Sequence, residues 1–414
     1  MLDQVIEDHD TGGRRQSNLG SHIDAFAAHL AGNGYAATTV RARLTLLGHF
    51  SEWLTCHRCG PSDLSDELVA TFLNERKRQR WLHRGQAATL RQFLLYLRTE
   101  GVVGTPAPVV DHSPVGQLQR QYEQYLRTER GLAPVTVTQY GRVLRRFLIE
   151  RFGNGTLDLR ALDVSTIATF VIHHAQTMTP RYAQGMVTAL RSICQFLRQG
   201  GAIDRDLAAA VPCVSDWRLA TIPKYLNPEE VERLLQTCDR QTAVGRRNHA
   251  ILLLLARLGL RAGEIIALTL DDIQWRAGEI IIRGSKRLPL DRLPLLAEVG
   301  EALATYIRND RPAHASRHVF LCTKAPRRGF SNPSTVSTIV QRALARAGLS
   351  PALKGAHLLR HSLATRMLRQ GASLPEIGVV LRHRSEQTTE IYAKVDIAGL
   401  RALAQPWPDL GGAQ

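Results

Sequence analysis

The chain has 414 residues with 53 Lys or Arg and 37 Asp or Glu, which gives a net charge of +16 and a pI of about 10.1. This length predicts two or three domains, and the positive charge favours a polyanionic partner, nucleic acid above all. The longest apolar run, residues 250–256, is too short to cross a membrane, and the acidic first ten residues are not typical of a signal peptide.

Six dispersed cysteines indicate free thiols in a reducing, cytoplasmic compartment. Cys56 and Cys59 have the spacing of half a zinc site, but no second pair lies nearby in the sequence, so we interpret them as structural.

The N-terminal half contains an internal repeat. Residues 34–50 match residues 131–147 at an offset of 97, and two shorter matches follow at offsets of 98 and 100. Apolar residues recur three and four apart in both copies, which predicts a bundle of about four short helices in each. We place the first bundle at 1–112 and the second at 113–218.

Two linkers separate the predicted domains. A proline-rich stretch at 104–114 lies between the two bundles, and residues 216–225 lead into a third domain. Asn227 should cap the first helix of that domain, with Pro228 in its first turn. Net charge is 0 over residues 1–115, +5 over 116–221 and +11 over 222–414, which predicts that the second and third domains clamp DNA.

Five residues between 261 and 392 have the chemistry of phosphodiester attack. Arg261 lies in the run Gly-Leu-Arg-Ala-Gly-Glu, His357 and Arg360 form His-x-x-Arg, and His383 and Tyr392 follow. Arginines stay charged and grip the non-bridging oxygens of a phosphate. A histidine near neutral pH can move protons, and a tyrosine hydroxyl can serve as the nucleophile. The spacing of three puts His357 and Arg360 on one helix face.

These motifs, in this order and with one β-hairpin after the first, resemble the tyrosine recombinases, also called the phage integrase family. The resemblance implies a lysine in the hairpin turn, the sixth residue of the set, a role that we assign to Lys286 with Arg287 as a distant second choice. Arg382 departs from the glycine that the family often places before this histidine, where a left-handed residue ends a helix. Ser385 should cap a helix from Glu386 to about Lys394 that carries Tyr392.

The resemblance implies a mainly α fold. Two tandem SAM-like bundles are followed by a mixed α+β catalytic domain at 222–404 with a small β-hairpin sheet, and by a C-terminal tail at 405–414. A short apolar helix from residue 396 would dock on a neighbouring protomer or pack on its own, and both interpretations stay open. The repeated bundles resemble recombinases of transposons and integrating elements more than chromosome-dimer resolvases.

The implied activity is site-specific recombination of double-stranded DNA through a 3′-phosphotyrosine on Tyr392, with no metal, ATP or other cofactor. Arg261 and Arg360 would stabilise the transition state, Lys286 would protonate the 5′ oxygen, His357 would shuttle protons and His383 would support the phosphate. Glu264 would orient Arg261. The partners would be a homo-tetramer on two synapsed sites, possibly including sister recombinases, in a bacterial cytoplasm at the nucleoid.

Three other classes compete with this interpretation. A type IB topoisomerase shares most of these residues but relaxes a single duplex. A DNA-binding relative without activity has no reason to keep all six groups. A zinc-dependent nuclease lacks a full set of ligands in the sequence.

Overall fold

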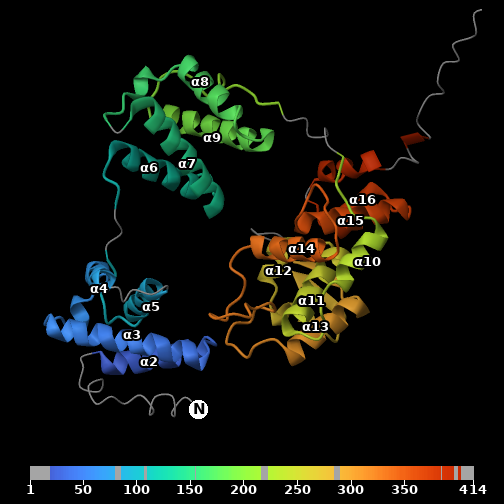
Figure 1. The fold of residues 1–414 in the computed structure, drawn as a ribbon. Coiled ribbons are helices and arrows are strands. Elements are labelled where there is room, and N and C mark those ends of the chain that lie inside the picture. Colours follow the sequence, from blue (N-terminus) through green and yellow to red (C-terminus); the bar gives the residue numbers. More distant parts are fainter. Residues whose placement is uncertain are drawn as a thin grey trace, which may run out of the picture. The chain divides into compact units, whose positions relative to one another are not determined.

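The computed structural model describes residues 19–79, 85–106, 110–153, 155–215, 222–283, 290–383, 385–395 and 400–401. By internal contacts the chain divides into two compact units, residues 1–105 with 222–414, and residues 106–221. Helices dominate both units (Figure 1). No described helix combines the length and the apolar character needed to span a bilayer.

The first repeat copy forms four α-helices within its described residues: α2 (Gly20–Gly32), α3 (Ala37–Cys56), α4 (Asp66–Arg78) and α5 (Gln86–Thr99). A 3-10 turn at Pro61–Asp63 precedes α4, and Ser65 caps that helix by accepting a hydrogen bond from the Leu68 amide. Helices α2 and α3 lie side by side (Figure 1) and enclose a shared apolar core. Cys59 packs against this core, whereas Cys56 is exposed.

The second copy repeats this plan with α6 (Pro114–Thr128), α7 (Pro134–Phe152), α8 (Val164–Ala175) and α9 (Pro180–Gln199), and a 3-10 turn at Leu159–Ala161. Proline occupies the first turn of α6, α7 and α9, where its missing amide hydrogen costs no helical bond. This bundle has its own apolar core.

Residues at equivalent positions of the two copies are buried in the core of their own bundle. The offsets found in the sequence pair buried residues with buried residues: Val40 with Val137, Phe50 with Phe147, Phe72 with Phe170, and Leu97 with Leu197. The aromatic pair formed by Phe50 and Phe72, 4.9 Å between ring centroids, recurs as Phe147 and Phe170 at 5.2 Å. The predicted repeat is therefore a repeat of core packing as well as of sequence.

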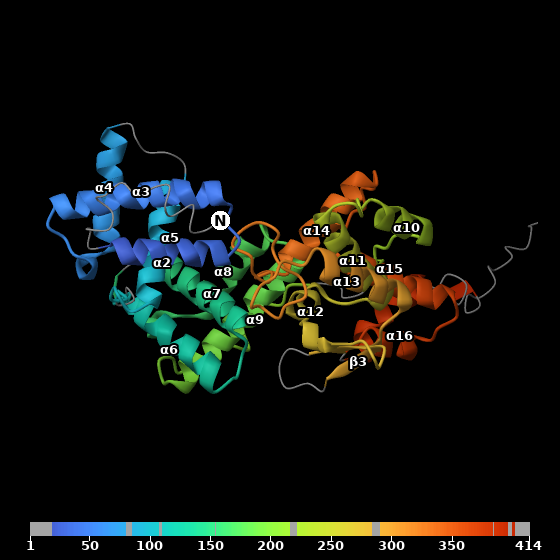
Figure 2. The same cartoon turned by 90° about the horizontal axis from the view of Figure 1, so that it is seen from below.

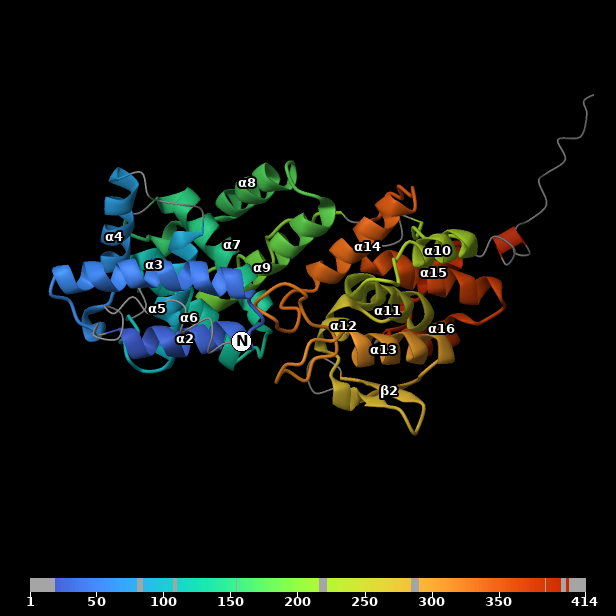
Figure 3. The same ribbon diagram turned by 60° about the horizontal axis from the view of Figure 1, so that its bottom comes forward.

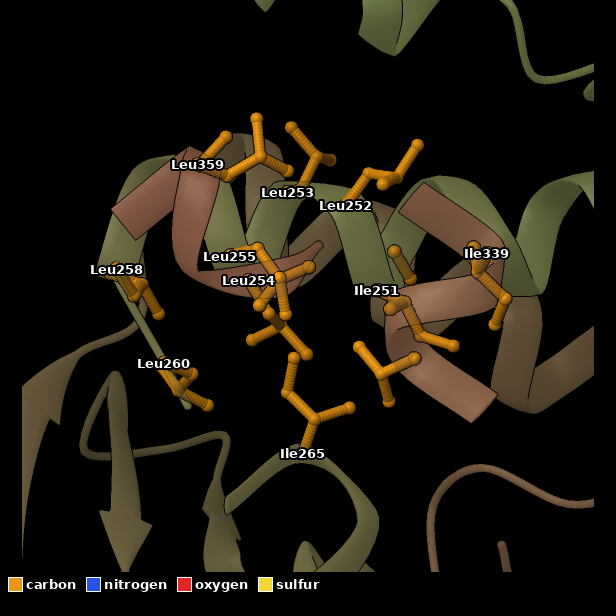
Figure 4. Packing of buried hydrophobic residues seen from close by; sticks show 14 of the residues in the cluster. Ile251, Leu252, Leu253, Leu254, Leu255, Leu258, Leu260, Ile265, Ile339 and Leu359 are labelled. Atoms are coloured by element: carbon orange, nitrogen blue, oxygen red, sulfur yellow. The ribbon is translucent and has the colours of Figure 1, made fainter. Parts of the chain in front are cut away.

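The C-terminal part is built around one buried helix. Its helices are α10 (Pro228–Gln236), α11 (Ala243–Leu258), α12 (Ala262–Ala267), α13 (Ala297–Asn309), α14 (Ser334–Arg346), α15 (Ala356–Arg369) and α16 (Leu374–Val380). Every side chain from Ala250 to Leu255 is buried, as expected for a helix that is apolar on all sides. Figure 4 shows apolar side chains of α11, including Ile251, in one cluster with Ile265, Ile339 and Leu359. Helices α13 and α15 flank α11 (Figure 3).

A small antiparallel sheet lies at one edge of the C-terminal part (Figures 2 and 3). The predicted hairpin is present as β2 (Glu279–Ile282) and β3 (Asp291–Pro294), with Ile280 opposite Leu293. A third strand, β1 (Ile273–Gln274), joins β2 and was not predicted. It follows directly from a 3-10 turn at Leu270–Asp272.

The start of the C-terminal part agrees with the sequence prediction. Asn227 accepts a hydrogen bond from the Glu230 amide at 2.8 Å, and the Glu230 carboxylate accepts one from the Asn227 amide at 2.9 Å. This reciprocal capping box fixes the beginning of α10.

The predicted helix from Glu386 to Lys394 is wrong. The segment forms two 3-10 helices, η4 (Glu386–Thr388) and η5 (Glu390–Val395), and the Ser385 side chain makes no capping bond. The break falls at Thr389, which is 2% exposed and whose hydroxyl bonds His383. Holding this hydroxyl inward tightens the chain into turns with hydrogen bonds three residues apart.

Gly259 ends α11 in the left-handed region, at φ 59°. A Cβ there would lie 2.7 Å from a methyl of Leu381 and 3.0 Å from a methyl of Leu363. We expect Gly259→Ala to destabilise the fold by left-handed strain of roughly 1–2 kcal/mol plus overpacking of about 1–3 kcal/mol. Gly348→Ala is the matched control, because its φ is 66° and no atom lies within 4 Å. Urea unfolding should show the larger loss for Gly259→Ala; equal losses would contradict the packing argument.

Candidate active site

Arg360 lies in the first turns of α15 and is 4% exposed. One terminal nitrogen donates to the Gly259 carbonyl and the other to the Leu381 carbonyl. Gly259 and Leu381 are the C-cap residues of α11 and α16, so the buried cation meets the negative ends of two helices. Burial, and then the charges of Arg261 and Arg382, lower the pKa of Arg360 to about 10, which leaves it protonated at neutral pH.

Arg261 caps α12 and is partly exposed, with 38% of its side chain accessible. Its guanidinium donates to the Glu264 carboxylate at 2.7 Å and to the Arg382 carbonyl at 2.9 Å. The Glu264 carboxylate also accepts a bond from the Arg261 amide at 2.8 Å. The predicted contact between Glu264 and Arg261 is therefore present, and it fixes the direction of this side chain.

Arg382 occupies the strained position that the sequence indicated. Its φ is 54°, a left-handed conformation that is costly for a residue with a Cβ. Its side chain is 6% exposed, and its guanidinium donates to the second oxygen of Glu264 at 2.8 Å. Burial would raise the pKa of Glu264, but Arg382 and Arg261 keep it below its usual range. One carboxylate thus joins two arginines from distant parts of the chain.

His383 follows Arg382 and is half-buried. Its Nδ1 lies 2.7 Å from the Thr389 hydroxyl, which orients the ring. Burial and the positive charges of Arg360 and Arg261 lower its pKa to about 4, so the ring is neutral at pH 7.

Tyr392 is 1% exposed and packs with Leu363, Ile377 and Leu381 in a small apolar cluster. Its hydroxyl lies 2.8 Å from Nδ1 of His361. Burial raises the pKa of the phenol to about 12, while the charge of Arg360 pulls it down. The predicted nucleophile therefore lies within the electrostatic reach of a predicted arginine.

His361 is a residue that our sequence prediction missed. It directly follows Arg360 and lies four residues after His357, so both histidines are on the same side of α15. Their rings are 6.5 Å apart between centroids. The only sequence signal is a second histidine at helical spacing, which has no meaning until the packing of η5 against α15 is known.

The structure thus gathers five of the six predicted residues around the ends of α11 and α16. Arg261, Arg360, His383 and Tyr392 are linked through the contacts above, and His357 reaches the group through His361 on the exposed side. Lys286 and its second choice Arg287 lie outside the described residues. Three guanidinium groups with one carboxylate leave an excess of positive charge suited to a phosphate.

Comparisons with known proteins agree with this geometry. Residues 224–398 match the model of the phage integrase family, and residues 120–201 match its N-terminal SAM-like domain. A putative integrase/recombinase of Sinorhizobium fredii, y4rA, is 44% identical over 94% of this chain and 94% of its own. The chain belongs to the phage integrase family.

A further relative and two solved structures extend the comparison. The tyrosine recombinase XerD of Mycobacterium tuberculosis is 30% identical over 68% of this chain and 94% of its own. The fold is similar to that of the XerH site-specific recombinase bound to its difH substrate, with a TM-score of 0.56 and 20% identity over 76% of this chain and 94% of the other. The comparison with the transposon Tn1549 integrase bound to circular-intermediate DNA gives a TM-score of 0.54 and 16% identity, over 69% of this chain and 99% of the other. The predicted family and fold class are confirmed.

The bridge made by Glu264 predicts a specific defect in this integrase-family chain. Glu264→Gln removes the charge that holds Arg261 and Arg382, so we expect strand cleavage to slow about 100-fold, the effect of a small misplacement of a reacting group. DNA binding should keep its strength because no cation is lost. The control is Glu298→Gln, whose carboxylate pairs with Arg257 at 2.8 Å outside this site. The cleavage rate is measured in a quenched-flow assay. A rate for Glu264→Gln equal to that of the wild type would refute the positioning role.

Proposed function

We propose that this protein is a site-specific DNA recombinase that cuts and rejoins strands through a 3′-phosphotyrosyl bond on Tyr392. The observation that carries the proposal is that the phenol of Tyr392 lies within electrostatic reach of the buried Arg360. A phenol and a fixed cation in one site are the minimum for attack on a phosphate. The family assignment supports the same class of reaction.

In the cleavage step, the oxygen of Tyr392 forms a bond to phosphorus and the bond from phosphorus to the 5′ oxygen breaks. Each terminal nitrogen of Arg360 carries two hydrogens, and its carbonyl bond uses one of them. The guanidinium is thereby held rigidly beside the place where negative charge develops. Arg261, partly exposed and oriented by Glu264, supplies a second cation.

The remaining predicted roles form part of the proposal. Lys286 protonates the departing 5′ oxygen, His357 relays protons from the exposed side, and His383, oriented by Thr389, supports the phosphate. The phosphotyrosyl ester conserves the energy of the broken bond, so rejoining to a 5′ hydroxyl of a partner duplex needs no ATP. The arginines supply the positive charge for which other phosphoryl-transfer enzymes use metal ions.

The proposed partners are double-stranded recombination sites, occupied by a homo-tetramer that can include sister recombinases. Two proteins of this fold were solved in complex with DNA, one with a difH substrate and one with a circular-intermediate DNA. We propose domain limits of 1–112, 113–218 and 222–404, followed by the tail at 405–414. We propose that the second bundle and the C-terminal part both bind the recombination site.

The two bundles differ in charge where they match in packing. Arg142, Arg145 and Arg146 of α7 correspond, at the offset of 97, to Thr45, Gly48 and His49 of α3. The second bundle therefore carries a basic stripe at three positions where α3 has no arginine, although α3 carries Arg41 and Arg43 nearer its start. We propose that the second bundle binds the core site and that the first serves contacts between protomers.

Tyr392→Phe tests the chemistry. The wild-type chain, incubated in EDTA with a randomised pool of nicked duplexes, should form a covalent adduct at the 3′ side of the cut, and Tyr392→Phe should form none while keeping its DNA affinity. Tyr306→Phe, another buried tyrosine of the C-terminal part, is the matched control and should keep the adduct. Adduct formation by Tyr392→Phe would refute the proposal. Relaxation of supercoiled plasmid without strand exchange would favour a topoisomerase.

The basic stripe of α7 predicts a difference between the bundles. Replacing Arg142 and Arg146 with alanine should weaken binding and lower the slope of log affinity against log salt by about 2, because two phosphate contacts are lost. The control replaces Thr45 and His49, the equivalent positions of α3, and should change neither quantity. Fluorescence anisotropy across a salt series measures the affinity and its salt dependence, on a duplex sequence recovered from the pool as a wild-type adduct. An equal loss from the two double variants would contradict the division of roles.

A further inference from the structure

The hydroxyl of Tyr392 meets one described side-chain nitrogen, and it belongs to His361. Nδ1 of His361 lies 2.8 Å from the tyrosine oxygen, and the two ring centroids are 5.7 Å apart. The contact joins α15 to η5, two elements that are separated by α16 and η4 in the chain. Because His361 follows Arg360 directly, the backbone that places the buried arginine also places this histidine.

The direction of this hydrogen bond follows from the protonation of both groups. With its pKa raised to about 12, the phenol keeps its proton at neutral pH and donates it. Burial, then the charges of His357 and Arg360, lower the pKa of His361 to about 4, so the ring is neutral. Nδ1 must accept the phenol proton, which puts the ring's own proton on Nε2.

The other two histidines of the site are less well placed for this task. Nδ1 of His383 is occupied by the Thr389 hydroxyl at 2.7 Å, and its ring lies parallel to that of Tyr392 with centroids 6.5 Å apart. His357 is exposed, and its ring centroid lies 6.5 Å from that of His361. Among the described residues, His361 is the base in hydrogen-bond contact with the nucleophile.

We propose that Nδ1 of His361 accepts the proton of Tyr392 when the tyrosine attacks DNA. This inference rests on the proposed function and adds a catalytic residue to it. The O–H bond of Tyr392 breaks as its oxygen bonds to phosphorus, the P–O5′ bond breaks, and the 5′ oxygen takes its proton from a separate acid. In rejoining, Nδ1 returns the proton to the leaving tyrosine.

The charges around His361 set the timing of the transfer. His357 and Arg360 face it from its own helix, Tyr392 from η5, and His383 from the turn after α16. A base this weak does not ionise a phenol of pKa about 12 in advance. The proton therefore moves as the bond to phosphorus forms, when the acidity of the tyrosine oxygen rises steeply.

His361→Gln tests the proposal, because its amide oxygen can still accept the tyrosine bond but cannot take the proton. The substrate is a nicked duplex recovered as a wild-type adduct, and the readout is the single-turnover cleavage rate of the full chain between pH 6 and 9. His249→Gln, a half-buried histidine of α11 outside the site, is the matched control.

The wild-type cleavage rate should not change between pH 6 and 9. The whole range lies above the His361 pKa of about 4, so the ring is neutral throughout. His361→Gln should be about 10²–10⁴-fold slower at pH 7. Its rate should then rise tenfold per pH unit, since hydroxide must take the proton. A His361→Gln rate within a few-fold of wild type and level with pH would overturn the proposal.

Two further measurements distinguish the proposed base from a residue that is only structural and from the acid that protonates the 5′ oxygen. Imidazole should restore cleavage to His361→Ala but not to Tyr392→Phe, and an absence of rescue in a variant that binds DNA normally would count against the proposal. A substrate with sulfur in place of the 5′ oxygen needs no acid, so the defect of His361→Gln should persist on it. Recovery on that substrate would make His361 the acid instead. If the wild type forms no adduct, the proposed function itself fails.

Discussion

A guanidinium group that is 4% exposed needs acceptors inside the protein, and Arg360 finds them at the ends of two helices. The carbonyls of Gly259 and Leu381 close α11 and α16, whose last carbonyls have no helical partner of their own. The two carbonyls satisfy the hydrogen bonds of the guanidinium and leave its positive charge in place. A carboxylate partner would neutralise that charge. The arrangement also joins the buried α11 to the segment that carries His383 and Tyr392. Gly259 is left-handed and tightly enclosed at the point where its carbonyl accepts a bond from the arginine.

The excess of positive charge around Arg360 explains the protonation of the site. Arg261 and Arg382 share the single carboxylate of Glu264, so the group keeps a net positive charge. Burial and the charge of Arg360 hold the pKa values of His361 and His383 well below that of a free histidine, and Arg261 and Arg382 lower the pKa of His383 further. Neutral imidazoles can accept protons at physiological pH, and a phosphate entering the site would meet unneutralised arginines. Left-handed strain at Arg382 is the structural cost of this bridge.

Much of the site follows from local patterns in the sequence. Arg261, Arg360 and Tyr392 stand in short motifs whose spacing reflects one helix turn or one loop, and the tandem bundles follow from the periodicity of buried residues such as Phe50 and Phe147. His361 could not be found this way, because its contact with Tyr392 depends on the packing of α15 against η5. The break at Thr389 was missed for the same reason: helix propensity is local, whereas the bond to His383 is not. The roles of the predicted site residues remain predictions, and Lys286 lies outside the described residues.

The identity of the nucleophile is the claim on which the rest of the account depends, and peptide mapping tests it directly. Trypsin should release residues 385–394 as one peptide, ending at Lys394 and containing Tyr392 as its only tyrosine. After trapping on a nicked duplex and digestion with nuclease and trypsin, mass spectrometry should find a nucleotide remnant on that peptide, attached to the tyrosine. A remnant on any other peptide, with residues 385–394 unmodified, would contradict the account.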